Sequence, residues 1–175
     1  MRIIGRRNLL RQEIDDYFSN HYVSNDEDQH VANFVRKSKS VLDVGCGDNL
    51  FKKYHHNGAF IGIDPFNKNA DRMCDVIDYD SPFKYELIIC FGSINFYNIK
   101  WVDDRMKKVA TLLKPNGRIC MKVNPCNPFE NGVVLDWFDK WTIPLIEHYA
   151  EMFNYDIENL REGGVGRIKF DYVAR

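Results

Sequence analysis

The sequence predicts an α/β fold, with a doubly wound and mostly parallel sheet of seven strands that ends in an antiparallel hairpin. Short apolar runs alternate with segments of helical periodicity along most of the chain, which is the element order of a parallel sheet. Near the C-terminus, two strand-like runs instead flank the glycine-rich stretch 163–166, a pattern typical of a hairpin.

Length and composition indicate a single domain that covers residues 1–175. Of these 175 residues, 45% are hydrophobic, which is enough to bury a full core. No apolar run approaches the ~20 residues that cross a bilayer, and the N-terminus lacks the apolar segment of a secretory signal. We therefore expect a cytoplasmic protein without membrane contact. The cysteines are scattered and number five, which favours a reducing compartment over a disulfide framework or a zinc site.

The first expected elements are two short helices within residues 8–37, and we interpret residues 1–38 as a helical cap. Leu9, Ile14 and Phe18 recur at near-helical spacing in the first of them. Five sheet strands are then expected at 40–44, 59–63, 74–77, 86–90 and 118–123. The fourth is an almost continuous apolar run, which is typical of a strand buried on both faces.

Helices and turns separate these strands. Residues 50–54 begin a helix, and residues 101–113 show the clearest helical period before Pro115 and Gly117 end it. Thr142 is placed to cap a last helix. The two strands of the closing hairpin are expected at 155–161 and 167–173.

A glycine turn directly after the first strand is the strongest signal of a site. Gly45 and Gly47 lack the Cβ atoms that would keep a flat ligand away from the backbone. Asp64 follows Gly45 by nineteen residues, at the end of the next strand, where a carboxylate can accept hydrogen bonds from both hydroxyls of a ribose. Ligands of doubly wound sheets bind at the carboxyl ends of the strands, so we expect a nucleoside at this edge.

Five segments resemble the motifs of class I S-adenosylmethionine (SAM)-dependent methyltransferases, a Rossmann-like family. They are 41–47, 61–65, 75–83, 86–90 and 109–121, the last of which is similar to a turn of methyltransferase type 11 proteins. Glu86 departs from the aspartate more usual in the family, and Asn49 stands where glycine is common. A dinucleotide site has the same layout, but Leu50 occupies the place of its third glycine. In a dinucleotide site, the third glycine allows tight packing of the helix whose N-terminus faces the pyrophosphate. Because SAM carries no phosphate, the absence of this glycine favours SAM over NAD as the cofactor.

The resemblance implies a cofactor role for each residue at the first two strand ends. The turn that would cradle the methionine part of SAM consists of Gly45, Cys46 and Gly47. Asp43 would hold the amino end of that methionine, or only cap the loop. Asp64, followed by Pro65, would take the ribose hydroxyls.

The resemblance also implies an adenine site on the next segment. Asp78 would accept a hydrogen bond from the adenine amino group, with Ile77 and Tyr79 beside the ring. Asp75 and Asp80 compete with Asp78 for this role.

The methyl end of the cofactor and the acceptor are assigned to loops past the later strands. Phe91 and Ser93 would lie beneath the methionine and methyl region, although Phe91 is equally suited to the core. Asn95 is the first candidate for substrate contact, and its alternative is a loop-stabilising side chain. In the family N-terminal helices often cover the cofactor, so Tyr17 and Tyr22 are candidates for a lid over the substrate.

These assignments predict a SAM-dependent methyltransferase that acts on a small molecule or an accessible polar group. No catalytic residue is assigned, since holding acceptor and methyl in line can supply much of the rate. The spacing of His, Cys and Asp predicts no metal site. Cys126 is a weak candidate for the nucleophile of a cytosine methyltransferase.

Three other functions stay open. One is a SAM-binding regulatory module without turnover, and another is a nicotinamide-dependent oxidoreductase. The third is a nucleic-acid methyltransferase, for which the net charge of −1 gives no support. Basic side chains that could contact phosphates, or simply form a solvated face, are Arg2, Arg6, Arg7 and Arg11.

Overall fold

The computed structural model describes residues 28–95, 99–123, 129–130, 133–134, 141–162 and 168–175, and six strands in them form one sheet in the order β2-β1-β3-β4-β8-β7. These strands are β1 Ser40–Val44, β2 Ala59–Ile63, β3 Tyr85–Phe91, β4 Leu113–Val123, β7 Tyr155–Glu162 and β8 Ile168–Ala174. The strands from β1 to β4 run parallel, β8 runs antiparallel to β4, and β7 runs antiparallel to β8. A separate two-stranded ladder pairs β5 (Phe129–Glu130) with β6 (Val133–Val134).

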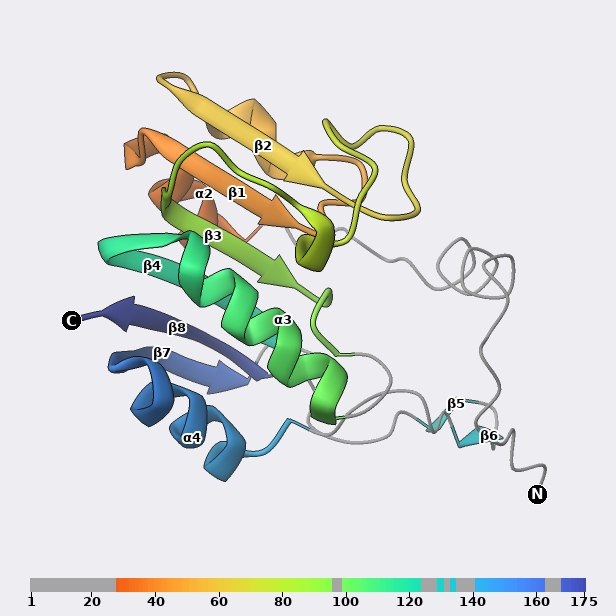
Figure 1. The fold of residues 1–175 in the computed structure, drawn as a ribbon, viewed down its shortest axis with the longest axis vertical. Helices are drawn as coiled ribbons and strands as arrows, with labels where there is room; N and C mark the ends of the chain where they lie inside the picture. Colours follow the sequence, from red (N-terminus) through yellow and green to blue (C-terminus); the bar gives the residue numbers. More distant parts are fainter. Residues whose placement is uncertain (1–27, 96–98, 124–128, 131–132, 135–140, 163–167) are drawn as a thin grey trace.

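Helices cover both faces of the sheet (Figure 1). They are α2 Gln29–Lys37 on one face, and α3 Ile99–Leu112 and α4 Ile143–Phe153 on the other. Val31 and Val35 of α2 are buried with Leu87 of β3, while Met106 of α3 and Ile146 of α4 belong to a larger cluster with the opposite side of the sheet. Among the helices of the described residues, none is long and apolar enough to cross a membrane.

The expectation of seven strands is wrong, because residues 74–77 do not form a third strand. Only an isolated bridge between Ile63 and Arg72 extends the sheet beyond β2. The short 3₁₀ helix η2 (Val76–Asp78) occupies most of the expected strand. A crossover between parallel strands needs about a dozen residues or more, and residues 64–73 are too few to supply one.

The end of α3 and the start of β4 also differ from expectation. The strand begins at Leu113, inside the predicted helix and well before the expected residue 118. Tyr85 pairs with Leu113 and Leu87 with Arg118, so the turn at 114–117 bulges out of the strand. The predicted turn therefore exists, but within a strand. The other expected helix start, at residues 50–54, is the 3₁₀ helix η1 (Leu50–Tyr54).

The C-terminal part follows the predictions closely. Thr142 caps α4, accepting a hydrogen bond from Leu145 N at 3.3 Å, and Asn154 ends the helix in the left-handed conformation. β7 and β8 form the expected antiparallel hairpin, whose glycine turn lies outside the described residues. The first expected helix, near Leu9 to Phe18, also lies outside them, whereas the second expected helix is present as α2.

Candidate functional site

The glycine turn after β1 packs against the chain that leaves β3. In Figure 1 the arrowheads of β1, β2 and β3 point the same way, so their carboxyl ends share one edge of the sheet. Gly45 N and Cys46 N both donate to Ile63 O of β2, at 2.8 and 3.1 Å. Gly45 has a φ of +67°, and a Cβ there would lie 2.4 Å from Ser93 Cβ. The position therefore requires glycine for both its backbone conformation and its contact.

Asn49 explains one departure from the family pattern. Its φ of 59° is left-handed, a conformation that glycine adopts freely and that asparagine tolerates better than most residues. Its side chain then reaches β2, where a Cβ on Gly62 would lie 1.9 Å from Asn49 Oδ1. Asn49 Nδ2 donates to Asn69 O at 3.2 Å. Asparagine thus keeps the shape of the turn and also fastens the next loop to it.

Asp64 ties the glycine turn to the turn after β2. Its Oδ2 accepts from Gly47 N at 3.1 Å, and its Oδ1 accepts from Phe66 N at 2.8 Å and Asn67 N at 2.9 Å. A carboxylate offers about four acceptor sites, so three backbone donors leave one site, on Oδ2. The half-buried Asp64 therefore has room for one further donor at the edge of the glycine turn, with Pro65 directly after it.

Asp43 is a buried carboxyl without a hydrogen bond from the described residues. It is 3% exposed, and burial raises its pKa to about 8, with a smaller contribution from the nearby negative charge of Asp64. Burying an unpaired carboxylate is strongly unfavourable, and a cation beside it would reverse the shift. The chemistry of this position therefore suits a positively charged ligand group.

Asp71 was missed by the sequence reasoning, yet it anchors the loop after β2. Its carboxylate accepts from Gly62 N at 2.8 Å and from Asn49 Nδ2 at 3.4 Å, and it forms an ion pair with Lys52. Hydrogen bonding and the Lys52 charge hold the pKa of Asp71 below its usual value, against the opposing effect of burial. An acid in an irregular loop gives no periodic signal, so its partners become visible only in three dimensions.

The η2 turn presents two of the three predicted adenine residues to solvent. Ile77 is 38% exposed, and Asp78 is exposed as well. Tyr79 instead turns into the core, where its hydroxyl lies 2.6 Å from that of Tyr85. The Tyr79 ring thus packs beneath the turn, whereas the position predicted for it, beside the adenine, would lie on the exposed side of the turn. Asp75, the competing carboxylate, is engaged by Arg105.

The residues after β3 lie beside the glycine turn. The hydroxyl of Ser93 is near the Cys90 thiol, but no partner among the described residues meets hydrogen-bond geometry. The Phe91 ring packs edge-on against Phe51, at 5.6 Å between centroids, on the α2 side of the sheet. Asn95 is 1% exposed. The predicted lid residues, the N-terminal arginines and Cys126 are outside the described residues.

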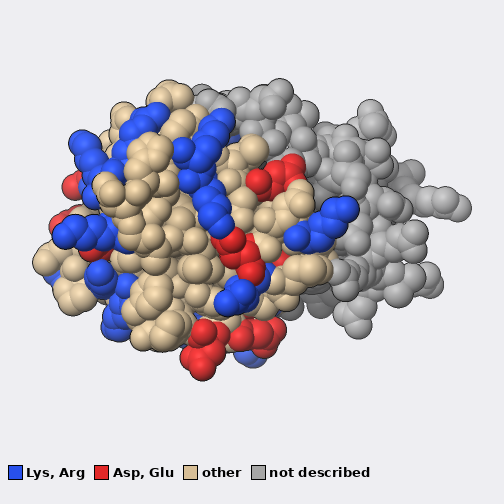
Figure 2. Space-filling model, turned by 90° about the horizontal axis from the view of Figure 1, so that it is seen from above, with Lys and Arg blue, Asp and Glu red and all other residues tan. Residues whose placement is uncertain are grey.

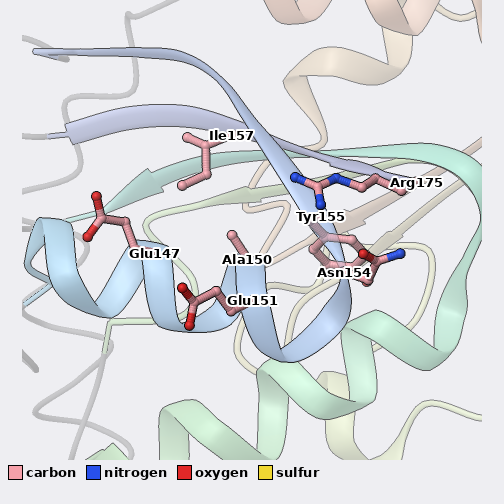
Figure 3. A pocket seen from close by; sticks show the side chains of 7 residues that line it. All are labelled: Glu147, Ala150, Glu151, Asn154, Tyr155, Ile157 and Arg175. Atoms are coloured by element: carbon pink, nitrogen blue, oxygen red, sulfur yellow. The ribbon is translucent and has the colours of Figure 1, made fainter.

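One groove on the described surface contains none of the predicted site residues. This open groove of about 710 Å³ lies between α4 and β7, lined in part by Glu147, Glu151, Tyr155 and Arg175 (Figure 3). Tyr155 begins a strand that runs parallel to β4, which puts this end of the groove at the sheet edge opposite the glycine turn.

On the described part of the face in Figure 2, Lys and Arg are interspersed with Asp and Glu. The described residues contain no group of side chains suited to hold a metal ion.

Comparisons with known proteins agree with the motif analysis. An uncharacterised methyltransferase of Schizosaccharomyces pombe is 27% identical in an alignment of 137 residues that covers 63% of this chain and 48% of that protein. The chain thus spans about half the length of this curated relative. A solved 1,6-didemethyltoxoflavin N1-methyltransferase of Burkholderia thailandensis, with bound S-adenosylhomocysteine (SAH), is similar at a TM-score of 0.70 and 12% identity, covering 94% of this chain and 86% of that one.

A second solved structure gives the same result. SAM-bound CalS10, an amino pentose methyltransferase of Micromonospora echinaspora, matches at a TM-score of 0.67 and 11% identity, covering 97% of this chain and all of that one. At such identities the likeness establishes the fold, which is the Rossmann-like fold expected from the sequence. The model of the methyltransferase domain family matches residues 19–162, most of the chain. The chain therefore belongs to the methyltransferase-domain family.

Proposed function

We propose that this protein binds SAM at the edge formed by β1, β2 and β3 and transfers its methyl group to a small molecule or an accessible polar group. The observation that carries the proposal is a buried Asp43 carboxyl, which has no hydrogen-bond partner in the described part of the chain, beside a bare glycine turn and the strand-end carboxylate of Asp64. When bound, SAM supplies a methyl group on a sulfonium, which an acceptor displaces in line.

The two carboxyl groups of the site, Asp43 and Asp64, suit two polar parts of the cofactor. Asp43 would face the ammonium group of the methionine part, which would remove the unfavourable burial of its own charge. Asp64 would accept one ribose hydroxyl at the free site on Oδ2. Its other three acceptor sites are used by backbone N–H groups of the two turns. The second hydroxyl would therefore need either a bridging water or the loss of the bond from Phe66 N.

The remaining assignments follow the shape of the edge. Ile77 and Asp78, both exposed on η2, would contact the face and the amino group of the adenine. The Ser93 hydroxyl, beside Gly45, would lie close to the methionine part. The family resemblance alone supports acceptor-side roles for Asn95, Tyr17 and Tyr22, where positioning of the acceptor would supply much of the catalysis.

A small acceptor is supported by the fold comparisons. The two solved neighbours are named as methyltransferases of 1,6-didemethyltoxoflavin and of an amino pentose, and this chain covers 86% and 100% of their lengths.

Two matched variants test the binding site. Asp64→Asn keeps an acceptor but loses a charge at the proposed ribose contact. Asp48→Asn makes the same change on an exposed neighbour that accepts bonds from Asn67 and Asn69. Calorimetric titration with SAM should show at least about tenfold weaker binding for Asp64→Asn, equivalent to about 1.4 kcal/mol. Asp48→Asn should bind like the wild type.

Transfer itself is tested with tritiated SAM and fractions of small molecules, RNA, DNA and protein. The proposal expects label in the small-molecule fraction. Label confined to RNA or DNA would instead indicate a nucleic-acid methyltransferase. SAM binding without label in any fraction would favour a regulatory module.

A further inference from the structure

The turn that carries Ile77 and Asp78 is fixed by an ion pair from a distant helix. Asp75 caps η2, and its Oδ1 accepts from Ile77 N at 3.1 Å. Its other oxygen, Oδ2, accepts from Arg105 of α3 through Nη2 at 2.6 Å and Nε at 3.2 Å. Each oxygen of one carboxylate thus serves a different element, so Asp75 links the turn to α3.

Arg105 is held in place by its own neighbour on the helix. Its guanidinium lies over the Trp101 ring, 3.5 Å from the centroid, and its Nη1 donates to Trp101 O at 3.3 Å. The Arg105 side chain is 12% exposed and that of Asp75 is 23% exposed. A planar guanidinium can stack on a ring and donate two bonds to one carboxylate oxygen, and a lysine ammonium cannot reproduce this geometry.

The turn needs this support because the chain around it is short. No sheet strand or α-helix lies between β2 and β3 to orient η2, and a three-residue 3₁₀ helix has few hydrogen bonds of its own. Val76 is the buried side chain of η2, at 3% exposure, while Ile77 and Asp78 both face outward. The direction of these two side chains therefore depends on how Asp75 is anchored.

We propose that Arg105 is a positioning residue for the adenine end of the cofactor, acting through Asp75 on the η2 turn. This inference rests on the proposed function. Arg105 touches no cofactor atom in this account. It selects the turn geometry in which Ile77 and Asp78 meet the adenine, and it leaves the contacts of the methionine and ribose ends unaffected.

The test compares two ligands that differ only at the adenine. SAH carries adenine on its ribose, and S-ribosylhomocysteine carries a hydroxyl group in the place of adenine. Arg105→Met is expected to raise the Kd for SAH about tenfold and to change the Kd for S-ribosylhomocysteine less than about twofold. The matched control is Lys100→Met, which removes one positive charge from the same helix at an exposed pair with Asp104. The control should bind both ligands like the wild type.

A second variant covers the case in which Arg105→Met does not fold. Asp75→Asn keeps the shape of the side chain and the Oδ1 acceptor for Ile77 N but weakens the bond to Arg105. It should show the same selective loss for SAH. The double variant should bind SAH no more weakly than the single variants, because both changes break one interaction.

Several results would overturn the inference. Equal losses for both ligands would make the ion pair a general support of the fold, and an unchanged Kd for SAH would remove any positioning role. An Arg105→Lys variant that restores wild-type SAH binding would contradict the need for the guanidinium. Failure of the wild type to bind SAH would instead overturn the proposed function itself, and the first titration would show it.

Discussion

Replacing Asp43 with asparagine is expected to stabilise the ligand-free protein at neutral and alkaline pH while weakening its binding of SAM. The Asp43 carboxyl has its pKa raised to about 8 in the folded protein, against an ordinary value of 3.8. Between these two pH values the folded state holds a proton that the unfolded state releases. The folded state is therefore progressively destabilised as pH rises from about 4 to about 8. Asparagine has no such proton, so the variant should lack this loss.

The size of the effect follows from the same two values. Each pH unit in this interval is worth about 1.4 kcal/mol, so the full interval gives about 6 kcal/mol between wild type and variant. Asp43 is 3% exposed, and solvent therefore screens it little. Even half of this difference would be a large share of the ~5–15 kcal/mol that stabilises a typical domain.

Urea unfolding at pH 5, 6, 7 and 8 measures this difference directly. The free energy of unfolding of Asp43→Asn minus that of the wild type should increase steadily with pH, because titrations elsewhere cancel in the subtraction. Asp48→Asn, at an exposed carboxylate, provides the control and should give a flat difference. Parallel curves for the wild type and Asp43→Asn would refute the reasoning.

The remaining predictions concern the glycine turn, a helix cap and a buried ion pair. Gly45→Ala should lower the urea midpoint and weaken SAM binding more than Gly92→Ala, because both glycines have positive φ but only Gly45 meets Ser93. Thr142→Ala should reduce the unfolding free energy by about 1 kcal/mol, and Thr142→Ser should not. Asp171→Ala should reduce it by about 1–3 kcal/mol, since it removes a buried carboxylate that is bonded to His30, Arg118 and Asn159. Equal losses for the two glycine variants, or no loss for the other two, would contradict these predictions.

Local patterns in the sequence were sufficient to predict the strand ends of the site. Gly45 and Asp64 each follow a short apolar run, and parallel strands bring such positions to one edge whatever the rest of the chain does. The cap at Thr142 was equally local, because the residue type and the period of the following helix define it. The family motifs then added the identity of the ligand.

Other features were not predictable because they depend on distances along the chain or on partners far away. The run around Val76 has β-branched residues that suit a strand, but the connection before it is too short for a crossover. The burial of Tyr79 follows from an irregular turn, which has no period. Asp71 and the Arg105–Asp75 pair join distant segments, and a single sequence carries no signal for such pairs.

Calorimetry of SAM binding in two buffers of different ionisation enthalpy tests the central claim most directly. At pH 7 we expect saturable binding that releases close to one proton, because Asp43 gives up its proton when it faces the ligand ammonium. The release should disappear in Asp43→Asn. Absence of binding at millimolar SAM, or binding of equal strength without proton release in both proteins, would contradict the account.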